Sequence, residues 1–153
     1  MYSENDIKVT NVKDNIKKRP EMFFGSRGIN PEAICTVVAE GALILGAAKT
    51  EIQHFGEWWF ICADVDWMIV DTKIEEANEI NLFERTFGFP EMGVNNCRWE
   101  AFTNFFSDAT LTTTTSGTRQ VSGDDADKEE YISVLNQLGE YRRVIGFKFN
   151  RDA

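Results

Sequence analysis

Hydrophobic positions near the start of the chain predict a short helix followed by a break. Val9, Val12 and Ile16 lie three and four residues apart, which predicts an amphipathic helix over residues 9–18. Pro20 cannot continue that helix, because it lacks a backbone N–H and restricts the residue before it. We therefore expect the first helix to end at this proline.

The next apolar stretch, residues 33–48, is hydrophobic on nearly every side of a helix. Asn30 and Pro31 before it fit the cap and the first position of a helix. A helix that is apolar all round is usually buried, so we expect this one at the centre of the fold. Gly41 and Gly46 each weaken a helix by roughly 1 kcal/mol relative to alanine, which predicts close packing at both positions.

The middle of the chain predicts two strands and then an acidic helix. Aromatic and β-branched residues in 51–55 and 58–64 favour strands joined by a glycine-containing turn. Residues 67–70 fit a continuation of the same sheet. Residues 74–87 fit an amphipathic, acidic helix, which a glycine and a proline follow.

The C-terminal half predicts five more elements. They are a helix over residues 95–107, a hairpin with strands 108–115 and 118–121, a helix around 127–138 and a strand over 142–149. In the last helix, Tyr131, Val134, Leu135 and Leu138 are expected to face inward.

Length and composition fit a single domain spanning residues 1–153. A chain of 153 residues that is 42% hydrophobic can bury one core. The order of its elements predicts an α+β fold, a two-layer sandwich of a mixed or antiparallel sheet with helices packed on one face. No apolar run approaches the ~18 residues of a membrane span, and residues 1–6 lack the features of a secretion signal. We expect a cytoplasmic protein that has no membrane partner.

The net charge of −9 is concentrated in the middle of the chain. Residues 50–110 carry twelve acidic and three basic side chains, whereas residues 1–30 carry six basic and four acidic ones. An acidic middle argues against nucleic acid as a partner, because contacts to phosphate need lysine and arginine. It permits a basic protein partner reached by electrostatic steering, although ordinary solubility is the simpler explanation of the charge alone.

Residues 18–26, which run KRPEMFFGS, resemble the KRPGMYIGS segment at the start of the ATPase domain of DNA gyrase. That domain belongs to the superfamily of gyrase, heat-shock chaperone, histidine kinase and MutL ATPases. Weaker resemblances lie at residues 37–38, 104–108 and 144–149. The resemblance implies a degenerate gyrase-type ATPase-like domain with a Bergerat-like fold, in which the first segment docks onto the core.

The residues that carry ATP chemistry in that family have no match here. With residues 37–38 aligned to the family's helix, Thr36 replaces the catalytic glutamate, Ala39 the aspartate and Glu40 the magnesium-binding asparagine. Threonine is not basic enough to activate water near neutral pH. The adenine-binding turn lacks its glycines, and the glycine-rich lid over the phosphates is missing. We therefore expect a protein that is not an enzyme and needs no cofactor.

Two aspartates and two tryptophans offer other possibilities for binding. Asp64 and Asp66 would point the same way on a strand and could bind a cation or act as an acid–base pair. Solvation of a strand end explains them more simply. Trp58 and Trp59 should point to opposite faces of the sheet, one into the core and the other toward a partner.

Metal sites have little support in the sequence. Cys35, Cys62 and Cys97 are far apart, and His54 is the only histidine, so reduced and mostly buried thiols are expected rather than zinc ligands. Residues 124–127 hint at a calcium loop but lack its glycine and terminal glutamate, and they fit the acidic start of a helix.

Together these features favour a non-catalytic protein-binding module. Its size, the missing catalytic groups and the acidic middle fit an immunity protein that neutralises a cognate toxin, with a basic nuclease domain as partner. The residues expected to bind the partner are Trp59, Asp64, Asp66, Asp71, Glu75, Glu76 and Glu79. The alternatives are a nucleotide-binding regulator with the gyrase-type fold and an inhibitor that mimics the ATPase component of gyrase.

Overall fold

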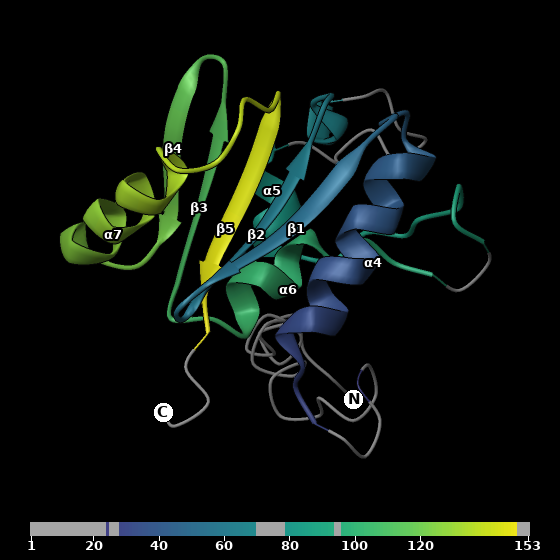
Figure 1. Ribbon diagram of the computed structural model, residues 1–153. Helices are drawn as coiled ribbons and strands as arrows, with labels where there is room; N and C mark the ends of the chain where they lie inside the picture. The colour runs from purple at the N-terminus through teal and green to yellow at the C-terminus, as the bar shows by residue number, and fades with distance from the viewer. Residues whose placement is uncertain (1–23, 25–27, 70–78, 94–95, 150–153) are drawn as a thin grey trace, which may run out of the picture.

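A five-stranded antiparallel sheet forms the centre of the molecule. The computed structural model describes residues 24, 28–69, 79–93 and 96–149. The strands are β1 (Thr50–Phe55), β2 (Trp58–Ala63), β3 (Ala109–Thr114), β4 (Gly117–Ser122) and β5 (Arg143–Lys148). Their order in the sheet is β1-β2-β5-β3-β4 (Figure 1). The last strand of the chain therefore lies between the two hairpins and pairs with both of them.

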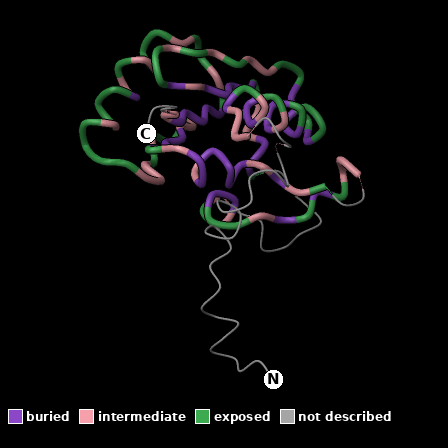
Figure 2. The backbone as a smooth tube through the Cα atoms, turned by 90° about the horizontal axis from the view of Figure 1, so that it is seen from below, coloured by how far each residue is buried: buried purple, intermediate pink, exposed green. Residues whose placement is uncertain are grey.

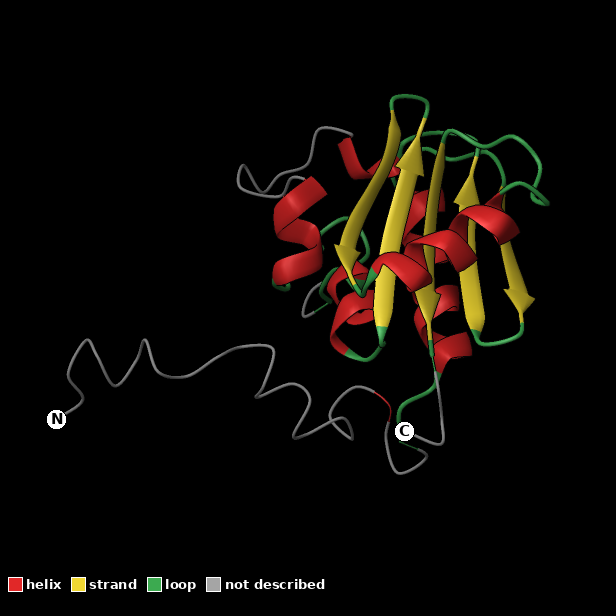
Figure 3. Cartoon of the chain, turned by 90° about the vertical axis from the view of Figure 1, so that its left-hand side faces the viewer, coloured by secondary structure: helices red, strands yellow, loops and turns green. Residues whose placement is uncertain are grey.

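Helices lie on both faces of this sheet. The inner face carries α4 (Pro31–Ile44), the 3-10 helix η2 (Trp67–Ile69), α5 (Glu79–Glu84) and α6 (Glu100–Phe105), and α7 (Asp125–Leu135) crosses the outer face (Figure 3). The predicted α+β class with an antiparallel sheet is confirmed, and most of the helices share one face as expected. The exception is α7, which covers apolar side chains on the second face.

The predicted central helix is α4, and it starts at the expected cap. The side-chain oxygen of Asn30 accepts the backbone N–H groups of Glu32 and Ala33 at 2.9 and 3.2 Å. Pro31 occupies the first turn, where its missing N–H costs no hydrogen bond. The sequence therefore specified the start of this helix through local interactions alone.

The two glycines of the predicted helix have different roles. Gly41 lies against Phe89, and a Cβ added there would be 3.0 Å from Phe89 Cε2, so the predicted close packing is confirmed. Gly46 has a φ of +118° and no atom within 4 Å of an added Cβ. It turns the chain beyond the end of α4, and the prediction of close packing there is wrong.

The inner core joins the inner helices to β2 and β5. Buried positions run through the middle of the fold, while much of α7 and the turns is exposed (Figure 2). Phe24 belongs to the segment that resembles the gyrase motif, and its ring contacts Trp99 and Phe106 edge-on at centroid distances of 5.4 Å. Docking of this segment onto the core is thus confirmed at Phe24. The predicted helix over residues 9–18 lies outside the described residues.

The outer core is smaller and forms beneath α7. Its buried members are Trp58, Phe60, Cys62, Ala109, Leu111, Tyr131 and Val144. Val134, Leu135 and Leu138 pack against them, as predicted from the helical spacing. This second core explains why β2 has apolar residues on both of its faces.

Residues 67–69 form η2 rather than the predicted strand. Trp67 and Met68 are adjacent and both fully buried in the inner core. Consecutive residues of a strand point to opposite faces, so a strand could not direct both side chains into one core.

Two predicted helices are shorter in the structure. The described part of the predicted helix over 74–87 is α5, which ends at Glu84, and α6 begins at Glu100 rather than near residue 95. Between them, Gly88 and Cys97 form an isolated antiparallel bridge. This extended pairing is incompatible with a helix at Cys97, where the prediction placed one.

Replacing Gly146 with alanine tests the close approach of α7 to the sheet. An added Cβ would lie 2.6 Å from Tyr131 Cε2 and 2.7 Å from Phe60 Cε1, and both rings are fully buried. We expect Gly146→Ala to lower the free energy of unfolding by about 1–3 kcal/mol because the core would be overpacked. The matched control is Gly139→Ala, where the nearest atom is 3.7 Å away and the expected change is below about 0.5 kcal/mol. Urea unfolding measures both, and equal effects would contradict this account of the packing.

Candidate functional site

A buried arginine gathers acidic side chains at the start of β5. Arg143 is fully buried, and its Nε and Nη2 donate to the two carboxylate oxygens of Asp66, both at 2.8 Å. Its Nη2 also donates to Glu79 at 2.9 Å, and its Nη1 to the Thr112 hydroxyl at 3.0 Å. Asp66 lies just before η2 and Glu79 begins α5, so one guanidinium connects three parts of the inner face.

A second arginine completes what we call the Arg143 cluster (Arg143, Asp66, Glu79, Thr112 and Arg119). Arg119 on β4 binds the other carboxylate oxygen of Glu79 at 2.9 Å, and its side chain is 52% exposed. A cavity of about 350 Å³ opens beside the cluster. Two guanidinium groups balance two carboxylates here, so this cavity is polar but carries no net charge.

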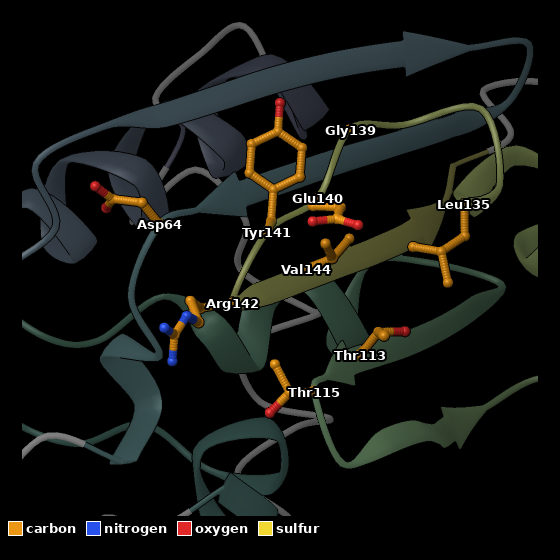
Figure 4. A pocket seen from close by; sticks show the side chains of 9 residues that line it. All are labelled: Asp64, Thr113, Thr115, Leu135, Gly139, Glu140, Tyr141, Arg142 and Val144. Atoms are coloured by element: carbon orange, nitrogen blue, oxygen red, sulfur yellow. The ribbon is translucent and has the colours of Figure 1, made fainter.

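A larger groove of about 680 Å³, the outer groove, lies on the other face of the sheet (Figure 4). Leu135 and Val144 supply apolar surface, while Asp64, Glu140 and Arg142 supply charge. Its other lining residues are Thr113, Thr115, Gly139 and Tyr141. The groove can therefore accept a side chain that is partly apolar and ends in a polar group.

The Tyr141 hydroxyl holds one wall of the outer groove against β1. It donates a hydrogen bond to the Glu51 carboxylate, which also forms an ion pair with Lys49 at 3.3 Å. The neighbouring carboxylate raises the pKa of Tyr141 to about 12. The same hydrogen bond, together with Lys49, lowers the pKa of Glu51.

The first turn of α7 confirms the interpretation of residues 124–127 as a helix start. Asp124 accepts the backbone N–H of Asp127 at 2.9 Å, and Asp127 accepts that of Asp124 at 3.0 Å. Lys148 on β5 binds Asp127 and Glu130, and hydrogen bonding to Glu130 and then Asp127 raises the pKa of its ammonium group.

On the exposed side of α7, Asp125 and Glu129 lie one helical turn apart. Neither forms an ion pair with another described residue, and we call this pair the α7 acidic face. Glu140, also exposed, follows the helix at the rim of the outer groove. Lys128 lies on the same stretch of the helix, so Asp125, Glu129 and Glu140 leave a net negative charge after this one lysine is counted.

The residues predicted to bind a partner fall into separate places. Asp66 and Glu79 meet in the Arg143 cluster, so their charges are taken up by arginines. Asp64 lies at the outer groove, where its carboxylate accepts the N–H groups of Ala48 and Lys49. The two aspartates do not pair, because β2 ends at Ala63, before both of them, and they share no strand face. The simpler expectation of solvation does not hold for Asp66 either, since its carboxylate binds Arg143.

Of the remaining residues predicted to bind a partner, the structure describes the position of Trp59 but not of the other three. Trp59 is half-buried on the inner face and its indole stacks on the His54 ring at 3.8 Å, whereas Trp58 is buried in the outer core, as their alternation predicts. The positions outside the described residues are Asp71, Glu75 and Glu76.

Sequence reasoning missed the two buried arginines. Arg98 and Glu100 form an ion pair in which each side chain is 3% exposed, and Trp67 Nε1 donates to the same carboxylate at 3.0 Å. Arg143 shares its strand face with Ile145 and Phe147, both in the inner core. The alternation of β5 was thus a signal that Arg143 points inward.

The positions aligned with ATP-binding residues lie on α4. Thr36 and Glu40 are exposed, with the Thr36 hydroxyl donating to the Glu32 carbonyl, and Ala39 is buried.

Burial raises the pKa of Cys62 to about 12 and raises that of Cys35 as well. Within the described residues, no group of three or more histidine, cysteine, aspartate or glutamate side chains is arranged to hold a metal ion.

Comparisons with protein-family models, with curated proteins and with solved structures give no match for this chain. The likeness to the gyrase-type ATPases therefore rests on the quoted motifs and stays a hypothesis.

No helix in the described part of the chain is long and apolar enough to cross a membrane.

Replacing Arg143 with methionine tests the energetic weight of the Arg143 cluster. We expect Arg143→Met to lower the free energy of unfolding by about 3–5 kcal/mol, because Asp66 and Glu79 would lose their buried cation. Arg119→Met is the control: its partner is also Glu79, but the exposed pair should contribute less than about 1 kcal/mol. Denaturant unfolding measures both variants, and a similar loss in the two would contradict this ranking.

Removing the Tyr141 hydroxyl tests its contact with Glu51. We expect Tyr141→Phe to raise the pKa of Glu51 toward 4.5, since the hydrogen bond that lowers it is gone. A carboxyl group whose pKa is lowered in the folded state stabilises the fold at pH values above its unfolded-state pKa, and this stabilisation is lost as the pH falls. The variant lacks this contribution, so its stability should decrease less on acidification. An NMR titration of the carboxyl carbons measures the pKa directly. In the control Tyr131→Phe, whose hydroxyl contacts Thr113, the Glu51 pKa should not change.

Proposed function

We propose that this protein is a non-catalytic binding module for a basic protein, and that it acts as an immunity protein against a cognate nuclease toxin. The observation that carries the proposal is the net negative charge of exposed Asp125, Glu129 and Glu140, which outnumber Lys128 beside them, on a chain with a net charge of −9. A cytoplasmic location, where it would meet such a toxin, belongs to the same proposal.

A nuclease is the kind of partner that fits this charge. Nucleases hold the phosphate backbone with lysine and arginine side chains, so their active clefts are basic. An acidic protein is attracted to such a cleft over a distance and can exclude the nucleic acid from it. This steering depends on exposed charge, which Asp125, Glu129 and Glu140 supply.

The distribution of ion pairs favours α7 over the Arg143 cluster as the contact surface. Asp66 and Glu79 already bind Arg143, and Glu79 also binds Arg119, so a basic partner would have to compete with these contacts. Asp125 and Glu129 have no described cation to displace. The outer groove lies beside α7 and can receive a lysine or arginine side chain, with its methylene groups on Leu135 and its charged end near Glu140.

Matched charge reversals locate the contact surface. We expect Asp125→Lys with Glu129→Lys to slow association with the toxin domain about tenfold at low salt and less at high salt, because steering depends on local charge. The control is Glu32→Lys with Glu40→Lys on α4, which changes the net charge equally on the inner side of the sheet. Glu75→Lys with Glu76→Lys tests the surface predicted from the sequence. Stopped-flow fluorescence gives the rates, and equal slowing by all three pairs would contradict a contact at α7.

Co-expression tests the biological role. The toxin domain to be used is a basic nuclease domain encoded beside the gene for this chain, and we expect co-expression to protect cells from it. The charge-reversed α7 variant should protect less than the α4 control. Failure to protect, together with saturable binding of ATP and Mg²⁺ in calorimetry, would contradict the proposal and favour a nucleotide-binding regulator.

A further inference from the structure

The outer edge of β1 has no neighbouring strand within the described residues. β1 is the first strand of the sheet order, and its six residues pair with β2 on one side. An edge strand presents alternate backbone N–H and C=O groups in a form that another strand can bind. This edge is therefore a potential site for pairing with a further chain.

Exposed apolar residues occur on β1 and at the end of α4, the helix that leads into it. Leu43, Ile44 and Ile52, which we call the β1-edge patch, are 45%, 45% and 39% exposed. They are three of the five large hydrophobic residues that are exposed in the described part of the chain. The end of α4 leads into the start of β1 across a short turn (Figure 1).

The inner face of β1 extends the apolar surface of this patch. Ile52 lies opposite Ile61, which is in the inner core, so its side chain points to the same side as α4. His54 lies on that side too, stacked on Trp59. The edge thus combines free backbone groups with an apolar and aromatic surface, the two features of sheet pairing between molecules.

The charge of this edge indicates which chain would bind there. Lys49 and Glu51 neutralise each other, and the Glu51 carboxylate is also held by Tyr141. The inner side of β1 carries Thr50, Ile52 and His54, with no carboxylate, lysine or arginine among them. A basic partner would find no free carboxylate among these side chains, whereas two copies of this acidic chain could approach without bringing like charges together.

The opposite edge of the sheet differs. β4 carries Arg119, which is tied to Glu79, and its pairing with β3 has a register shift between Thr110 and Leu111. Paired charges occur at both edges, so the irregular pairing is what distinguishes β4, because a register shift hinders the addition of a further strand. The sheet is therefore open to extension at β1 and protected at β4.

We propose that two copies of this chain pair antiparallel along β1, across a twofold axis, and continue their sheets into one. In such a pair the Thr50 end of one strand faces the Phe55 end of the other, which brings Leu43 and Ile44 toward His54 of the partner subunit. The pairing leaves α7 free, because α7 covers the outer face beside β3 rather than β1.

Sedimentation equilibrium of the full chain across a concentration series tests this pairing. The wild-type protein should approach twice the monomer mass as its concentration rises. Ile52→Lys and Leu43→Lys should each weaken the dimer about tenfold or more, because a charge would be buried in the interface. The matched control is Ile80→Lys: Ile80 is 50% exposed but lies beside β4, so the dimer should be unchanged.

Circular dichroism of each variant checks that it is folded. If Ile52→Lys unfolds the protein, Leu43→Lys on the helix surface tests the dimer without it. A wild-type mass that stays monomeric up to the highest soluble concentration overturns the proposal. A dimer that survives both edge variants, or that is lost equally in the Ile80→Lys control, overturns it too. Because the toxin-binding assays report on α7, either proposal can fail while the other stands.

Discussion

The position of β5 between the two hairpins is the constraint on which the rest of the structure depends. This strand pairs with β2 on one side and β3 on the other, so the sheet exists as one unit only when the end of the chain is in place. Its alternate residues serve two cores: Ile145 and Phe147 belong to the inner one, and Val144 to the outer one. Gly146 allows Tyr131 of α7 to approach the backbone.

β5 also organises the charges. Arg143 at its start is buried because it belongs to the inner-facing set of residues, and a buried cation needs anionic partners. Asp66 and Glu79 supply them from two different segments, with Thr112 as a further acceptor. At the other end of the strand, Lys148 binds Asp127 and Glu130 of α7. In the acidic middle of the chain, Asp66 and Glu79 are held in ion pairs, whereas Asp125 and Glu129 form none with a described residue. This difference is the reason that we place the proposed contact surface at α7.

Local signals in the sequence were sufficient for most elements. The cap at Asn30, the aromatic strands of the first hairpin and the spacing of apolar residues in α7 each act within a few residues. The prediction was wrong where the outcome depends on distant contacts. Trp67 and Met68 look like strand residues but fill the inner core together in a helical turn. Asp64 and Asp66 look like a solvated strand end, but one caps the turn before β1 and the other binds an arginine far along the chain.

The sequence by itself determined the class of fold, the starts of α4 and α7 and the hairpins, because these follow from neighbouring residues and from the period of apolar positions. It also determined the net charge. The tertiary structure alone decided which carboxylates are neutralised, that α7 covers the second face of the sheet, and that β1 has a neighbouring strand on one side only among the described residues. The physical reason is that Asp66 and Arg143 are 77 residues apart, and strand order arises from pairing between segments whose local patterns do not specify their neighbours.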